Sequence, residues 1–445
     1  MTASGRNLTG IETWSGVPRA VTRAPRPIYA LIRPHTVPRI VFVLFLLFVA
    51  TLPFEAADVG FASGSLSVAK ISGLIFLACY FFYYNPLSGK RGLPSIPAPM
   101  WWFLAYVAVY TVNGFFLSAE LLRPFLNLLG TLVQLLLIFW IASSLLQNEL
   151  MTKATLFTFS LGSVVLATGI LLGLPGFSTV IETQAGARIT SLGFNANVLG
   201  TIMALAAIGV IGLILDFGVR RRASKIFLPA LLAPLLAIIV RTGSRAAIGA
   251  LVIGFAAFLL PGRRSSKMPA LVIVLLGIGL VGTMVVRSPT SWTRLEEAYE
   301  GKLSDRQQIT AAAVDMVAEK PIFGWKPVEF WQELGRRVGH FFGTRDAHNL
   351  FLHLLLEVGI VGAVPFLAGL WLCVQAAWKG RGGPLGIVPL ALLAAVLTAN
   401  LTHTYLTRKP FWLVMGLSVA AGSAAVGPRL RFGRAQTDPH WQACA

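Results

Sequence analysis

Charged residues, cysteines and histidines are all scarce in this sequence. Charged residues occupy 12% of the 445 positions, hydrophobic residues occupy 56%, and the mean hydropathy is +0.73. Soluble domains carry charges at about a quarter of their positions, so an ordinary soluble protein is excluded. The three cysteines and six histidines form no cluster at metal-ligand spacing. We therefore predict neither a disulfide framework nor a metal site, and no cofactor.

Acidic residues are scarce relative to basic ones, with 18 Asp and Glu against 37 Lys and Arg. The net charge of +19 does not indicate nucleic-acid binding, because much of the Lys and Arg stands in short clusters beside apolar blocks. Basic residues in such places set membrane topology and contact anionic lipid. Membrane lipids are thus expected partners, and nucleic acid is not.

The apolar residues form blocks long enough to cross a bilayer, which takes about 20 helical residues. They predict an all-α, polytopic transmembrane helical bundle of about 12 spans. The predicted spans cover residues 39–56, 65–84, 98–117, 123–146, 153–174, 194–216, 225–240, 244–261, 267–286, 349–378, 384–402 and 410–427. The seventh is short, and the tenth is long enough to begin as a helix outside the bilayer.

These spans divide the chain into five parts. Residues 1–38 form a basic N-terminal arm, 39–286 hold the first nine spans, 287–348 form a long loop, 349–427 hold the last three spans, and 428–445 form a tail. A cleaved signal peptide is not expected, because the first apolar block begins late and no small-residue cleavage site follows it.

Basic clusters recur in alternate loops, on the side of the N-terminus. They comprise Lys90 and Arg91, Lys153, Arg220 to Arg222 with Lys225, Arg263 and Arg264 with Lys267, Lys379 with Arg381, and Arg429, Arg431 and Arg434 of the tail. The first opposite loop carries Glu55 and Asp58 instead. The positive-inside rule then predicts both termini in the cytoplasm and the loop 287–348 outside it.

Several arginines fall on the predicted external side, where topology disfavours them. They are Arg188, Arg241, Arg245, Arg294, Arg306, Arg336, Arg337 and Arg345. The simplest reason for arginine there is an anionic ligand, because the guanidinium fork matches phosphate oxygens. For Arg336 and Arg337 the alternative is a solvated loop face.

The long loop contains one predicted amphipathic helix. Ser304 with Gln307 fits a capping box, and Pro321 ends the helix. Its apolar face consists of Ile309, Ala312, Ala313, Met316 and Val317. We expect this helix to lie on the membrane surface or to pack over the bundle. The aromatic residues that follow, Trp325, Phe330 and Trp331, suit either a sugar-stacking platform or an interfacial belt.

Arginines around a pyrophosphate, with one histidine as general base, suit transfer from a diphosphate-linked donor to an alcohol. His348 is the candidate base; its alternative is a residue that only begins a helix. His353 and His403 are interpreted as packed structural residues, and Asn349 as a helix cap. Glu357, inside the tenth span, is expected to pair with an arginine or a backbone amide. Gly359 and Gly362 are interpreted as sites of close helix packing.

The run Asp346-Ala347-His348-Asn349-Leu350-Phe351-Leu352, followed by Glu357, Gly359 and Gly362, resembles the signature of the O-antigen ligase and polymerase superfamily. Three further stretches resemble that family in order: ARITSLGFNANVLG with Arg188, Asn195 and Asn197; RTGSRAAIGA with Arg241 and Arg245; and LSDRQQITAAAVDMVAEKPIFGW with Arg306. Ala196 and Asp305 depart from the pattern, and neither removes a proposed catalytic group.

The resemblance implies a metal-independent, inverting glycosyltransferase of the bacterial inner membrane with its site on the periplasmic face. His348 would be the base, with Arg245 and Arg306 also catalytic. Arg188, Arg241, Arg245 and Arg306 would bind the diphosphate, and Asp346, Asn349, Asn195, Asn197 and Glu357 would support them. The donor would be an undecaprenyl diphosphate-linked glycan.

Two questions stay open at this stage. The acceptor is lipid A–core for a ligase, or a growing glycan for an O-antigen or exopolysaccharide polymerase. The alternative from another class is a lipid-linked glycan transporter or flippase. The sequence shows no internal repeat and no paired broken helices near mid-membrane, which are typical of transporters.

Overall fold

The computed structural model describes residues 37–56, 67–84, 93–177, 179–183, 186–215, 227–262, 267–287, 292–293, 296, 299, 306–339 and 345–431. The chain divides into two compact units, residues 1–39 and 40–445. The predicted arm, apart from its last two residues, lies outside the described residues, as do Ser304, Arg294 and the tail beyond Arg431.

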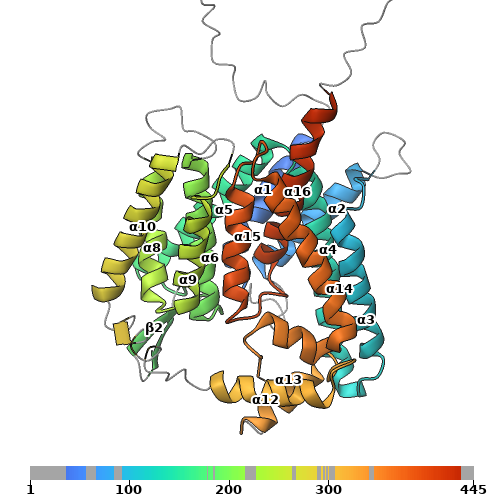
Figure 1. Cartoon of the computed structure of the whole chain (residues 1–445). Helices are drawn as coiled ribbons and strands as arrows, with labels where there is room; N and C mark the ends of the chain where they lie inside the picture. The colour runs from blue at the N-terminus through green and yellow to red at the C-terminus, as the bar shows by residue number, and fades with distance from the viewer. Residues whose placement is uncertain are drawn as a thin grey trace, which may run out of the picture. The chain divides into compact units, whose positions relative to one another are not determined.

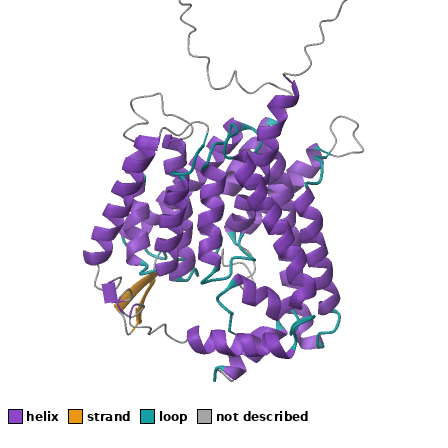
Figure 2. Cartoon of the chain, viewed as in Figure 1, coloured by secondary structure: helices purple, strands orange, loops and turns teal. Residues whose placement is uncertain are grey.

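The described part of the second unit is mainly helical (Figures 1 and 2). Its helices are α1 (Arg39–Thr51), the 3₁₀ helix η2 (Leu52–Phe54), α2 (Val68–Tyr83), α3 (Ala98–Gly114), α4 (Ala119–Leu145), α5 (Glu149–Leu171), α6 (Ala196–Leu215), α8 (Leu232–Arg241), α9 (Arg245–Ala257), α10 (Lys267–Arg287), α12 (Arg306–Glu319), α13 (Glu329–Arg337), α14 (Leu350–Gly380), α15 (Val388–Asn400) and α16 (Lys409–Arg431).

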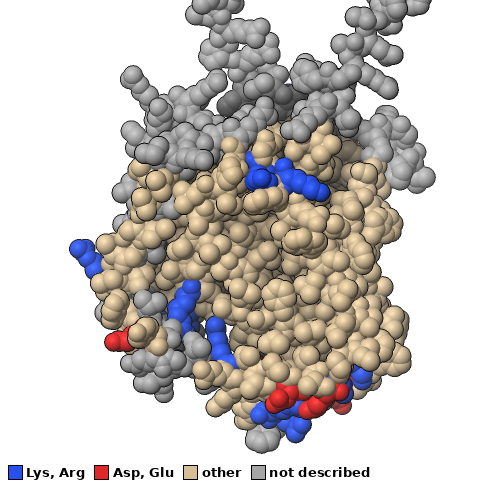
Figure 3. Space-filling model, in the orientation of Figure 1, with Lys and Arg blue, Asp and Glu red and all other residues tan. Residues whose placement is uncertain are grey.

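Each predicted span coincides with a helix to within a few residues. Among the described residues, five helices are long and apolar enough to cross a membrane: α4, α5, α6, α14 and α16. On the face drawn in Figure 3, basic and acidic side chains gather at the lower end, a few basic side chains lie near the upper end, and most of the surface between them is uncharged. These features fit a membrane protein, while the span count and the external location of the long loop remain predictions.

Helix α6 is the most enclosed of the long helices, because α5, α8, α9 and α15 all pack against it. Small residues allow these close approaches. A methyl group added at Gly200 would meet Ala247 of α9, and one added at Gly212 would meet Val388 of α15. On the other side of the bundle, α14 packs against α3 and α16.

The all-α prediction missed a two-stranded antiparallel ribbon between α5 and α6. Strand β1 (Thr179–Thr183) pairs with β2 (Gly186–Thr190), and Arg188 of β2 lies opposite Ile181. The β-branched residues of TVIET favour extended structure. Strands this short give a far weaker periodic signal than the apolar spans beside them.

The predicted amphipathic helix is confirmed as α12, which ends before Pro321. Ile309, Ala313 and Met316 are buried, in a small core that also contains Phe330 and Leu334 of α13. Leu356 of α14 completes that core, so α12 packs over the bundle (Figure 1).

The long helix α14 is broken at Gly359, whose φ of 61° and ψ of −166° are not helical. The turn after α12 docks into this break. The Trp325 amide donates to the Leu356 carbonyl at 2.6 Å, and the Ile360 amide donates to the Pro321 carbonyl at 2.9 Å. Gly359 is thus a site of close packing, but the interpretation as a close approach of two helices is wrong, because the partner is a loop.

We expect Gly359→Ala to destabilise the protein strongly. A Cβ atom there would collide with the Ile322 carbonyl, in a backbone conformation that is essentially restricted to glycine. The conformational strain alone costs roughly 1–3 kcal/mol. Thermal unfolding in detergent measures the loss. The control is Gly130→Ala in α4, where a Cβ would meet nothing within 4 Å. Equal melting temperatures for the two variants would contradict the prediction.

Candidate active site

Asn349 fixes the start of α14. Its Oδ1 accepts hydrogen bonds from the amides of Phe351 at 2.9 Å and Leu352 at 3.2 Å, so the capping interpretation is confirmed. Its Nδ2 donates to the carbonyl of Leu401 at 3.2 Å. One side chain therefore ties residues 345–349 to the loop 401–408 between α15 and α16.

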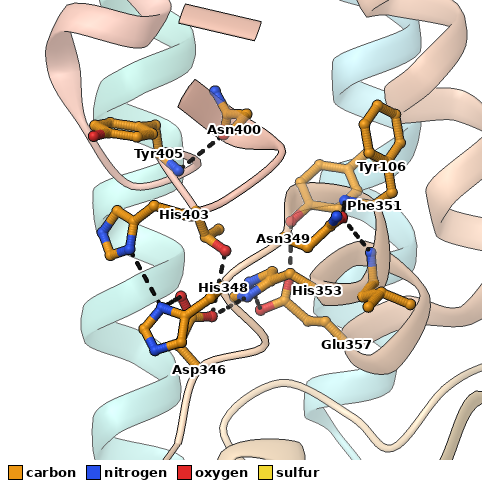
Figure 4. A network of polar contacts seen from close by, with 12 residues as sticks. Tyr106, Asp346, His348, Asn349, Phe351, His353, Glu357, Asn400, His403 and Tyr405 are labelled. Carbon is orange, nitrogen blue, oxygen red and sulfur yellow. Dashed lines mark hydrogen bonds and ion pairs between the residues drawn. The ribbon is translucent and has the colours of Figure 1, made fainter. Parts of the chain in front are cut away.

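Asp346 is the centre of a polar network in this segment (Figure 4). Its Oδ1 lies 3.0 Å from His353 Nδ1 and accepts a hydrogen bond from Thr404 Oγ1 at 3.3 Å. Its Oδ2 lies 3.8 Å from His348 Nδ1. That nitrogen in turn faces His403 Nδ1 at 3.4 Å. One carboxylate thus contacts His353 directly and lies beside His348, which in turn faces His403.

The network continues into α14 through buried groups. His353 Nε2 lies 3.6 Å from Glu357 Oε1, and the Tyr106 hydroxyl donates to Glu357 Oε2 at 3.0 Å. The expectation that Glu357 pairs with an arginine or a backbone amide is therefore wrong. His353 and His403 are buried, as expected for packed residues, but both belong to this polar network.

Charge and burial set the protonation states of Asp346, His348 and His403. Burial opposes ionisation of Asp346, but the hydrogen bond with His353 and the neighbouring histidines lower its pKa to about 2. Burial lowers the pKa of His348 from its ordinary value of 6.5; Asp346 opposes this, and Arg306 and Arg345 add to it. Burial likewise lowers the pKa of His403 to about 4. At neutral pH the carboxylate is ionised and both histidines are neutral.

The backbone of His348 is strained, with a φ of 52° that non-glycine residues rarely adopt. Its side chain is 28% exposed, whereas that of His403 is buried. In Figure 4 the Nδ1 atom of His348 faces Asp346 and His403, and Nε2 points away from both. One ring nitrogen of His348 therefore lies in the network, and the other points away from it.

A second cluster joins two of the sequence motifs. Arg188 Nε donates to the Thr242 carbonyl at 3.0 Å, and its Nη2 donates to Asn197 Oδ1 at 3.1 Å. Ser244 Oγ donates to the same Asn197 oxygen at 3.0 Å and also caps α9, the helix that begins at Arg245. Arg188 and Arg245 are thereby held at the same end of α6.

The loop 401–408 connects the two clusters. The Tyr405 hydroxyl donates to the Asn197 carbonyl at 3.1 Å, while His403 and Thr404 contact His348 and Asp346. The charge of Arg306, the first residue of α12, acts on both His348 and His403. Figure 3 shows basic side chains within a hollow at this end of the molecule.

Other predicted site residues have different positions. Asn195 Oδ1 accepts from the Val198 amide at 2.9 Å and so begins α6. Arg241 is exposed at the end of α8, and among the described residues it makes no hydrogen bond or ion pair with either cluster. Arg336 and Arg337 pair with Glu333 at 2.7 Å, and Arg337 also pairs with Glu319 at 2.6 Å. Their anionic partners are therefore within the protein.

The three aromatic residues do not form a common exposed platform. Phe330 is fully buried, and Trp325 donates to the Met316 carbonyl at 2.8 Å. The Trp325 ring also packs under Lys320, at 3.6 Å from the ammonium nitrogen to the ring centroid. These contacts give Trp325 and Phe330 structural roles.

Sequence reasoning missed the part played by the loop 401–408. His403, Thr404, Tyr405 and Arg408 all lie at the site, and the charge of Arg408 acts on His403. The sequence did contain a signal for this loop, because the polar run THTYLTRK separates two apolar spans on the predicted external side. Arg408 also belongs with the external arginines by the same topology.

Asp346, His348 and His403 have a geometry that also suits a metal ion. Each offers one ligand atom, and the three atoms lie within 4.8 Å of one another. Neutral imidazole and ionised carboxylate are the forms that bind divalent metals. The two histidines are 55 positions apart in the sequence, so a search by sequence spacing could not find this cluster.

Apolar helices that carry a histidine–carboxylate network and an arginine cluster at one end define an integral membrane protein with a polar site. The sequence model of a protein family described as O-antigen ligase matches residues 230–367 of this chain. An O-antigen ligase of Pseudomonas aeruginosa is 26% identical over 290 residues, which cover 64% of this chain and 67% of that protein. Both findings support the resemblance to the O-antigen ligase superfamily that the motifs indicate.

Proposed function

We propose that this protein is an O-antigen ligase-type glycosyltransferase of the bacterial inner membrane, with both termini cytoplasmic and the site facing the periplasm. It transfers a glycan from undecaprenyl diphosphate to a hydroxyl group of lipid A–core. The observation that carries the proposal is His348: a neutral, partly exposed imidazole beside an ionised carboxylate and within the field of Arg306.

In the proposed reaction, His348 Nε2 takes the proton of the acceptor hydroxyl as its oxygen attacks the anomeric carbon. The bond from that carbon to the diphosphate breaks on the opposite face, so the configuration inverts. The diphosphate leaves with the bonding electron pair, and His348 carries the proton. Asp346 then stabilises the imidazolium cation, because its carboxylate lies beside Nδ1.

Arginine is suited to the leaving group, because its guanidinium cannot lose its proton and binds phosphate oxygens bidentately. Arg188 is oriented by Asn197 and the Thr242 carbonyl. Arg245 begins α9 directly after the capping residue Ser244, and Arg306 begins α12. Rigid elements thus place each arginine, so little reorganisation is needed as charge develops on the diphosphate.

The decisive experiment is transfer by the purified protein in detergent, from synthetic undecaprenyl diphosphate oligosaccharide, with EDTA present. Lipid A–core and lipid-linked repeat unit are offered separately as acceptors. Glycan on lipid A–core supports the ligase, whereas a ladder of longer lipid-linked chains identifies a polymerase. No product, with the lipid instead crossing liposome membranes, identifies a transporter.

Arg306→Gln should lower the transfer rate by about 10²- to 10³-fold, the usual cost of one charge-stabilising donor. It should also raise the pKa of His348, because Arg306 lowers that pKa in the native protein. The acid limb of the kcat profile therefore moves to higher pH. The control is Arg336→Gln, which removes an exposed arginine paired with Glu333. Equal transfer rates for the two variants would show that Arg306 is not part of the site.

A further inference from the structure

His348 and His403 face each other through their Nδ1 atoms. His348 Nδ1 and His403 Nδ1 are 3.4 Å apart, and the rings are nearly parallel, at 24°. A neutral imidazole carries its hydrogen on one nitrogen and a lone pair on the other. A hydrogen bond between these atoms therefore requires that one Nδ1 donates and the other accepts.

Asp346 decides which of the two donates. Its Oδ2 lies 3.8 Å from His348 Nδ1. A hydrogen on His348 Nδ1 is flanked by two acceptors, the His403 lone pair and the carboxylate. With the hydrogen on His403 Nδ1, the His348 lone pair would face an anion, which is repulsive. The geometry therefore favours the His348 tautomer with its hydrogen on Nδ1 and a lone pair on Nε2.

We propose that His403 is a positioning residue that, together with Asp346, holds His348 in this tautomer. Only this tautomer has a lone pair on Nε2, the nitrogen that points away from the network (Figure 4). The inference rests on the proposed function of His348 as general base. It gives a role in the reaction to a residue far along the chain, outside the run Asp346–Leu352.

His403 is itself held in place. Its amide donates to the Ala399 carbonyl at 3.1 Å, and its ring meets the Tyr405 ring edge-on, with centroids 5.2 Å apart. The next turn of the loop is closed by the Tyr405 amide, which donates to Asn400 Oδ1 at 3.0 Å. The Nδ1 lone pair is thus fixed in direction before any substrate binds.

Two substitutions separate the positioning role from a packing role. His403→Asn places Oδ1 near the position of Nδ1 and keeps an acceptor, whereas His403→Leu keeps bulk and removes it. We expect His403→Leu to lower kcat by about 10- to 100-fold, as is typical when an orienting partner is lost. The KM for the acceptor should change little. His403→Asn should recover most of the rate. Thr402→Val, in the same loop, is the control.

Histidine tautomers can be measured directly by ¹⁵N NMR of the full-length protein with labelled histidine, because the chain has six histidines and His348→Gln assigns the signal. We expect the Nδ1–H form of His348 in the native protein and in His403→Asn, and a shift toward Nε2–H in His403→Leu. The inference would be overturned if His348 carried its hydrogen on Nε2 in the native protein, or if His403→Leu and His403→Asn had equal effects on the tautomer.

The two readouts keep this inference separate from the proposed function. If the native protein shows the Nδ1–H tautomer but transfers no glycan, the proposed function fails and the positioning of His348 stands. If transfer occurs but its rate and the tautomer do not depend on His403, the positioning role fails and the proposed function stands. Melting temperatures establish that each variant is folded.

Discussion

His348→Ala should lower the rate of glycan transfer by about 10²- to 10⁴-fold, the usual contribution of a positioned general base. The donor should still bind, because the arginines proposed to hold the diphosphate lie on β2, α9 and α12, whereas His348 lies in the segment 345–349 before α14. Transfer and donor binding are therefore measured together. A variant that loses binding and rate in parallel would show that His348 holds the donor and does not act as the base.

The pH profile of the native protein gives an independent check. His348 works as a base only when neutral, and burial lowers its pKa below the ordinary value of 6.5. As pH falls, kcat should therefore decline with its midpoint below pH 6.5. A decline that begins well above pH 7 would mean that another group is the base.

Much of this fold could be predicted from the sequence, because a membrane span is a local property. A run of about 20 apolar residues favours a helix through its own sequence. Each predicted span overlaps a helix, and among the described residues five of these helices are long and apolar enough to cross a membrane. The amphipathic helix α12 was equally accessible, because Ile309, Ala313 and Met316 share one face at helical spacing. The ribbon β1–β2 was missed, because strands of five residues give little periodic signal.

The contacts within the site could not be predicted, because they join residues far apart in the chain. Tyr106 and Glu357 are 251 residues apart, and Arg188 reaches the carbonyl of Thr242 from another motif. The run around His348 indicated the proposed base but not its contact with His403, because the sequence does not show how the loop that carries His403 folds. Gly359 is similar: the break in α14 depends on the loop that docks there.

Zinc ions should abolish transfer. Zinc is bound tetrahedrally by nitrogen at about 2.0–2.1 Å, so two such ligands lie roughly 3.4 Å apart. His348 Nδ1 and His403 Nδ1 are separated by 3.4 Å, and Asp346 offers a third ligand. Zinc bound at His348 Nδ1 forces the hydrogen onto Nε2, where the proposed base needs its lone pair. Micromolar zinc should therefore inhibit, and EDTA should restore the native rate.

Three comparisons sharpen this test. Magnesium should have no effect at the same concentration, because it prefers an octahedron of oxygen ligands. His403→Asn should transfer glycan while tolerating more zinc, because an amide oxygen replaces an imidazole ligand. EDTA alone should leave the native rate unchanged. If EDTA instead stopped transfer and zinc restored it, the three residues would hold a required metal ion, and the mechanism through a free His348 lone pair would be wrong.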